Sequence, residues 1–124
     1  MMKLILKIHA AVEILGGFIL LFNPEFLLSN HSPNLQALVV AKLYGIAAFF
    51  IGIISYLISK EFEYNQTFKK IILSVIGFHL CLAFYMYGVY QQGLTPHLGA
   101  FGTHLTLAVG SLLLYLKDFQ KFES

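Results

Sequence analysis

Four long apolar segments occupy nearly all of the sequence and restrict the folds open to it. They cover residues 4–22, 36–58, 70–90 and 98–116. A helix of about 20 residues crosses the hydrocarbon core of a bilayer, because each residue adds about 1.5 Å along the axis. Charged residues form only 11% of the chain, against about 25% in soluble domains. The sequence therefore predicts an all-α polytopic membrane protein, a single four-helix transmembrane domain spanning residues 1–124.

The lysines are distributed asymmetrically, and this predicts an orientation. Seven of them lie before or near the start of the first segment, between the second segment and the start of the third, or after the fourth: Lys3, Lys7, Lys60, Lys69, Lys70, Lys117 and Lys121. The other two connections contain no lysine. Because cytoplasmic loops carry an excess of positive charge, we expect an up-down-up-down bundle with both termini in the cytoplasm.

Several function classes receive no support from the composition. The chain lacks a basic patch of the kind that binds nucleic acid, so no nucleic-acid partner is expected. Its single cysteine, Cys81, permits neither an internal disulfide nor a C-x-x-C redox pair. The bilayer itself is the expected environment of most side chains.

Ionisable residues inside the apolar segments indicate a polar centre. His9 and Glu13 are four residues apart in the first segment, so they share a helical face. A carboxylate within a membrane span is costly and usually functional. Lys42 in the second segment lies at a compatible depth, and we expect it to pair with Glu13 inside the bundle. The alternative is that Lys42 extends outward to the membrane surface.

Two further histidines, His79 and His104, are expected near this centre, although one intramembrane histidine is more often a packing residue than a ligand. A haem would need both at similar depth, and their positions predict an offset of about 7 Å. His9, Glu13 and His79 have donor types suited to a metal, but no specific spacing signature. The sequence therefore assigns no metal, and any cofactor remains unknown.

Small residues form stripes on two segments and predict close helix packing or self-association. The first stripe comprises Ala41, Gly45, Ala48 and Gly52, and the second comprises Gly99, Gly102, Thr106 and Gly110. Either stripe can meet another helix of the same bundle or a second copy of the chain. The sequence alone does not choose between them, and a homo-oligomer is one expectation.

The whole chain resembles the DoxX-like group of small four-helix bacterial membrane proteins. The resemblance rests on Asn23-Pro24 after the first segment, the runs Ala41–Ala48 and Phe49–Gly52, and the positions of His79 and His104. At position 42 this chain has lysine where arginine is expected. The resemblance implies a bacterial inner-membrane location. Some relatives are linked to quinone-dependent redox enzymes or act as accessory subunits, and the group is functionally mixed.

The run Ala11–Gly16 is similar to the glutamate-bearing helix of small multidrug-resistance exporters. This resemblance implies that Glu13 exchanges protons for cationic drugs. The chain differs from those exporters because it has no tryptophan and because its lysines favour one fixed orientation.

Three interpretations of function follow. The first is a binding or accessory protein whose polar site, Glu13, Lys42, His79, His104 and His9, holds a quinone or another apolar small molecule. The second is a proton-coupled transporter. The third is a structural subunit of a larger membrane complex, in which the polar residues determine helix register. An intramembrane enzyme is the least favoured.

Overall fold

The computed structural model describes residues 1–26, 28 and 35–123, and within these residues it contains four α-helices and no strand. The helices are α1 (Met2–Phe22), α2 (Leu35–Lys60), α3 (Gln66–Gln91) and α4 (Gly99–Asp118), with 3-10 turns η1 (Pro24–Phe26) and η2 (Phe119–Phe122). All four helical segments are long and apolar enough to cross a membrane. The predicted all-α bundle is confirmed, and the four helices indicate an integral membrane protein.

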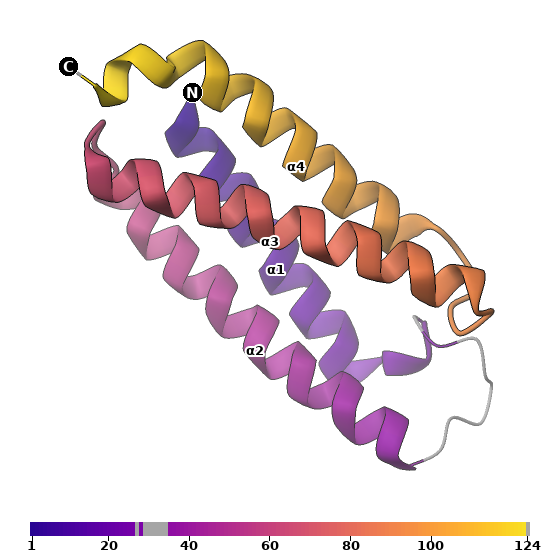
Figure 1. Cartoon of the computed structure of the whole chain (residues 1–124). Coiled ribbons are helices and arrows are strands. Elements are labelled where there is room, and N and C mark those ends of the chain that lie inside the picture. Colours follow the sequence, from indigo (N-terminus) through magenta and orange to yellow (C-terminus); the bar gives the residue numbers. More distant parts are fainter. Residues whose placement is uncertain (27, 29–34, 124) are drawn as a thin grey trace.

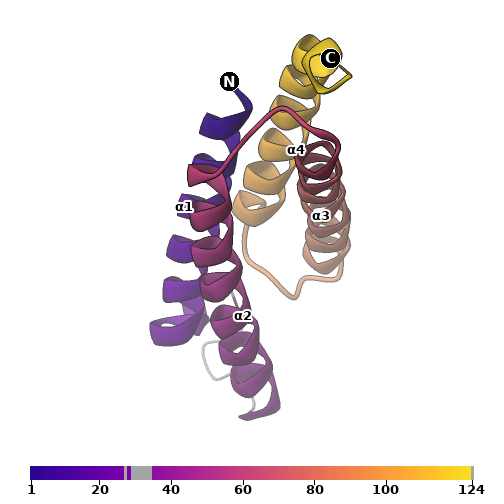
Figure 2. The same ribbon diagram turned by 90° about the vertical axis from the view of Figure 1, so that its left-hand side faces the viewer.

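The helices are arranged as two antiparallel pairs (Figures 1 and 2). α1 packs along α2, and α3 packs along α4, whereas α1 has a smaller contact with α4. Both termini and the α2–α3 connection lie at one end of the bundle, which we call the termini end (Figure 1). The α3–α4 connection lies at the opposite end. Successive helices therefore run in opposite directions, as the short connections predict.

Some helices extend beyond the apolar segments, because polar residues add turns at their ends. α3 begins at Gln66, four residues before the expected start at residue 70. The side chain of Asn65 accepts a hydrogen bond from the backbone N–H of Phe68, and this N-cap stabilises a polar first turn. α2 likewise continues to Lys60. An apolar pattern cannot detect such turns.

Glycines allow α1 and α2 to approach at backbone distance. A Cβ atom at Gly17 would lie 2.7 Å from the carbonyl oxygen of Gly45, and one at Gly52 would lie 2.8 Å from that of Ala10. Gly45, Ala48 and Gly52 are all buried. The small-residue stripe of α2 is therefore used inside the bundle. Of the two predicted stripes, only that of α4 remains for self-association.

The termini end holds the main apolar core and a polar network. The core is formed by Met2, Ile5, Leu6, Ile72, Ile76, Tyr115 and Phe122. Asp118, only 3% exposed, accepts hydrogen bonds from the Tyr64 hydroxyl at 2.8 Å and from Lys121 Nζ at 2.7 Å. The N-terminal ammonium lies 3.8 Å away. Burial and the hydrogen bond to Asp118 raise the pKa of the Tyr64 phenol. This network joins three parts of the chain.

Candidate functional site: a buried carboxylate and three histidines

The middle turns of α1 place two ionisable side chains in the interior of the bundle. His9 and Glu13 are one turn apart and are 2% and 3% exposed. The intervening Ala10 packs against Gly52 of α2, which fixes the rotation of α1 about its axis. The helical face that His9 and Glu13 were expected to share therefore points into the bundle.

Three imidazoles from three helices form a continuous chain, which we call the histidine chain. His9 Nδ1 lies 2.7 Å from His79 Nε2, and His79 Nδ1 lies 2.8 Å from His104 Nδ1. The rings of His79 and His104 are therefore in contact, although the sequence predicts an offset of about 7 Å in depth between the two residues. His79 is fully buried at 0% exposure. The chain connects α1 to both helices of the other pair.

Each contact in the histidine chain requires one proton between two ring nitrogens. With three neutral rings, His9 donates to His79 and His79 donates to His104, or both bonds run in the opposite direction. The two arrangements differ only in where each ring carries its proton. A proton arriving at one end and leaving at the other converts one arrangement into the other. The geometry is thus that of a proton relay.

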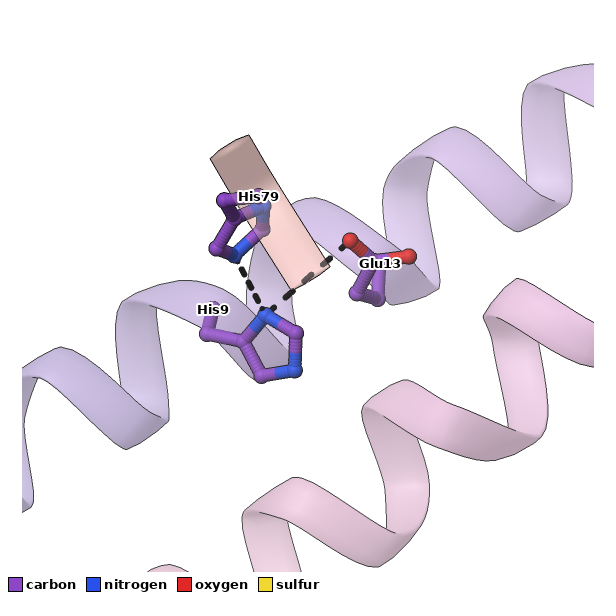
Figure 3. Close-up of side chains that lie close together, drawn as sticks. All are labelled: His9, Glu13 and His79. Atoms are coloured by element: carbon purple, nitrogen blue, oxygen red, sulfur yellow. Dashed lines mark hydrogen bonds and ion pairs between the residues drawn. The ribbon is translucent and has the colours of Figure 1, made fainter. Parts of the chain in front are cut away.

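Glu13 lies beside this chain without a full partner. Its Oε1 atom is buried without a hydrogen bond, and it lies 4.0 Å from His9 Nδ1. Figure 3 shows Glu13 and His79 turned toward the same nitrogen of His9. One ligand atom from each of these three residues lies within 4.8 Å of the other two. The site therefore gathers two imidazoles and one carboxylate.

Lys42 is not part of this group. It is exposed on α2, and the ion pairs of the described residues do not include one between Lys42 and Glu13. Gly45, three residues later, faces α1, and helical geometry turns Lys42 about 60° away from it. The expected pairing is therefore absent from the structure. Of the five residues predicted to form the polar centre, His9, Glu13, His79 and His104 lie together, and Lys42 lies outside this group.

A groove of about 600 Å³ between α2 and α3 reaches His9 from the side of the bundle. We call it the α2–α3 groove. Apolar side chains such as Ile51, Ile58, Ile71, Val75 and Phe78 dominate its wall, and Ser55, Thr67, Lys70 and Ser74 add polar groups. Sequence analysis missed this groove. The signal was the recurrence of Thr67, Lys70 and Ser74 on one face of α3.

The position of His9 links the groove to the histidine chain. Its Nδ1 atom makes the contacts with both His79 and Glu13. Figure 3 shows the other ring nitrogen, Nε2, pointing away from these two residues. A molecule in the α2–α3 groove can therefore meet a ring of the histidine chain without displacing its neighbours.

Comparison of the chain with family models, with curated proteins and with solved structures found no match.

Proposed function

We propose that the protein is an integral membrane binding protein whose α2–α3 groove accepts a membrane-soluble small molecule with a polar head, of the quinone class. The observation that carries this proposal is that His9, one end of the histidine chain, forms part of the groove wall. Small-molecule sites combine mostly apolar walls with a few placed polar groups. The α2–α3 groove has this composition.

The chemistry of His9 suits a carbonyl head group. With a proton on Nε2, the ring donates to a quinone oxygen, while Nδ1 accepts a hydrogen bond from His79 Nε2–H, at 2.7 Å. His79 Nδ1 then accepts from His104. Binding of a carbonyl would thus select one of the two proton arrangements of the histidine chain. The same chain would supply a proton to a reduced quinone oxygen.

The resemblance to the DoxX-like group supports the same proposal, because some relatives in that group are linked to quinone-dependent enzymes. We propose membership of that group and a bacterial inner-membrane location. The lysines favour a cytoplasmic termini end. Reporter fusions at residues 65 and 94 are expected on the cytoplasmic and opposite sides. An external reporter at residue 65 would contradict this orientation.

The test of binding uses two matched variants of α3. Ser74 lines the α2–α3 groove, whereas the adjacent Leu73 is 43% exposed and is not part of the groove wall. Full-length protein in mild detergent is titrated with a short-chain ubiquinone, and bound quinone is measured after gel filtration. Ser74→Phe is expected to fill the groove and lose binding, and Leu73→Phe is expected to retain it. Wild-type protein without saturable binding would refute the quinone class.

Proton-coupled transport is the second candidate, favoured by the continuous histidine chain beside Glu13. In that case, protein in liposomes should carry protons when a cationic substrate is added, and His79→Phe should stop this flux. A dye trapped inside the liposomes would report the pH change. Quinone binding without such flux would favour the first proposal.

Self-association or docking into a larger membrane complex is proposed for the outer face of α4. Cβ atoms built at Gly102 and Gly110 meet no atom within 4 Å. A shallow groove lined by Leu105, Thr106, Val109, Gly110 and Leu113 follows the same face. Small residues of this kind let two membrane helices approach closely.

A further inference from the structure

We propose that His9, Glu13 and His79 bind a divalent transition-metal ion through His9 Nδ1, the Glu13 carboxylate and His79 Nε2. This site lies beside the α2–α3 groove and leaves His9 Nε2 free to face it, but the metal would replace the proton that His9 Nδ1 and His79 Nε2 share in the histidine chain. It goes beyond the proposed binding function and does not depend on what occupies the groove. All three residues are at most 3% exposed.

The three donors lie near the spacing that such an ion requires, and small side-chain movements would bring them to it. The donor atoms lie within 4.8 Å of one another. Zinc–ligand bonds of about 2.0–2.2 Å at tetrahedral angles hold ligand atoms about 3.3–3.6 Å apart. The Glu13 carboxylate is 4.0 Å from His9 Nδ1, so it must move closer by about 0.5 Å. The two imidazole nitrogens, now 2.7 Å apart, must separate slightly when an ion replaces the proton between them.

The charge of Glu13 supplies the second, independent reason. Its Oε1 atom is buried and has no hydrogen-bond partner. Lys42, the cation expected to neutralise it, is exposed elsewhere on α2. A buried carboxylate without compensation is strongly disfavoured in a membrane. A divalent ion between Glu13 and the two neutral imidazoles would give Oε1 a partner, and an anion such as hydroxide at the open coordination position would offset the remaining single positive charge.

His104 completes the arrangement from the far side of His79. Metal-binding histidines usually donate their second ring N–H to a fixed acceptor, which orients the ring. When His79 Nε2 holds the metal, the ring proton is on Nδ1, which lies 2.8 Å from His104 Nδ1. His104 accepts this hydrogen bond and carries its own proton on Nε2. His104 is therefore a positioning residue, not a ligand.

The donor set indicates the class of metal. Two imidazoles and one carboxylate suit zinc, iron, cobalt and manganese, whereas copper(I) prefers sulfur ligands. The chain's single cysteine, Cys81, is exposed and outside the site. Three protein ligands leave at least one coordination position open, as in catalytic metal sites.

The experiment uses full-length protein in mild detergent, stripped with a chelator and then titrated separately with Zn²⁺ and Co²⁺. Metal retained after gel filtration is measured by mass spectrometry, and Co²⁺ is followed by its visible absorption. A single ion per chain is expected. His104→Gln should lower the affinity about 10–100-fold, and His9→Gln, Glu13→Gln and His79→Gln should each lower it further.

The control is His97→Gln, which removes a histidine from the α3–α4 connection, outside the proposed site, and should leave metal binding unchanged. Circular dichroism and gel filtration establish that each variant is folded. Wild-type protein that binds neither ion, or equal binding by Glu13→Gln and His97→Gln, would overturn the proposal.

A further measurement needs no variant. X-ray absorption at the zinc edge of the wild-type protein should show two imidazoles and oxygen. A sulfur ligand, or oxygen alone, would contradict the assignment. The groove variant Ser74→Phe separates the two proposals, because it should lose quinone and keep zinc.

Discussion

The substitution Gly52→Ala tests the contact that fixes α1 and its polar face. A Cβ atom at position 52 would lie 2.8 Å from the carbonyl oxygen of Ala10 and 2.8 Å from the backbone nitrogen of Ile14. These are backbone atoms, so the strain can be relieved only if the two helices separate. Overpacking of this kind costs about 1–3 kcal/mol. Alanine regains about 0.5–1 kcal/mol of that in a helix.

Gly77→Ala in α3 is the matched control, because a Cβ atom there meets nothing within 4 Å. It should gain the same stability of about 0.5–1 kcal/mol from replacing glycine with alanine in a helix, without a clash. The difference between the two variants therefore isolates the overpacking of α1 against α2, about 1–3 kcal/mol. Unfolding by SDS in mixed micelles, followed by circular dichroism, measures it. If Gly52→Ala is as stable as Gly77→Ala, α1 and α2 do not pack through this contact.

Asp118→Asn should destabilise the termini end by about 1.5–3 kcal/mol, because it weakens charge-assisted hydrogen bonds; the same SDS titration measures this. The pKa of the Tyr64 phenol is raised in the folded protein. Its contribution to the free energy of unfolding is therefore complete below the unfolded-state pKa of about 10 and is lost as the pH rises through the folded-state pKa. The Tyr64→Phe variant has no phenol to ionise, so its free energy of unfolding should fall less at alkaline pH than that of the wild-type protein. Gly102→Leu should reduce the oligomer mass in mild detergent without changing unfolding. The effects of Glu13→Gln and Lys42→Met on the free energy of unfolding should be additive within about 0.5 kcal/mol, because the two side chains do not pair. A larger coupling energy would indicate that the ion pair forms.

The helices were predictable because the property that defines them is local. Twenty apolar residues suffice to indicate a membrane helix wherever the segment packs. Their ends were less predictable, because a cap such as Asn65 acts through one side chain and adds a polar turn. The shared face of His9 and Glu13 was also local, since it follows from a spacing of four residues.

The partners of that face depend on how each helix is rotated, which no local pattern determines. α2 carries the small residues of its glycine stripe on one face and Lys42 on the next. Both faces had a reason to be buried: the glycines allow close approach, and the lysine could neutralise Glu13. The structure buries the glycines, because backbone contact with α1 extends along the helix whereas one ion pair is a single contact whose desolvation offsets its attraction.

α3 presents polar groups on two faces, and one of these faces lines the α2–α3 groove. His79 points toward α1 and α4, whereas Thr67, Lys70 and Ser74 line the groove toward α2. Lys70 lies near the termini end, and His9 lies about 10 Å along α1 from its first residue. A phospholipid would place its charged head beside Lys70 and only its tails near His9. A molecule whose polar group must reach His9 carries that group into the apolar region, which a neutral quinone head tolerates and a phosphate does not.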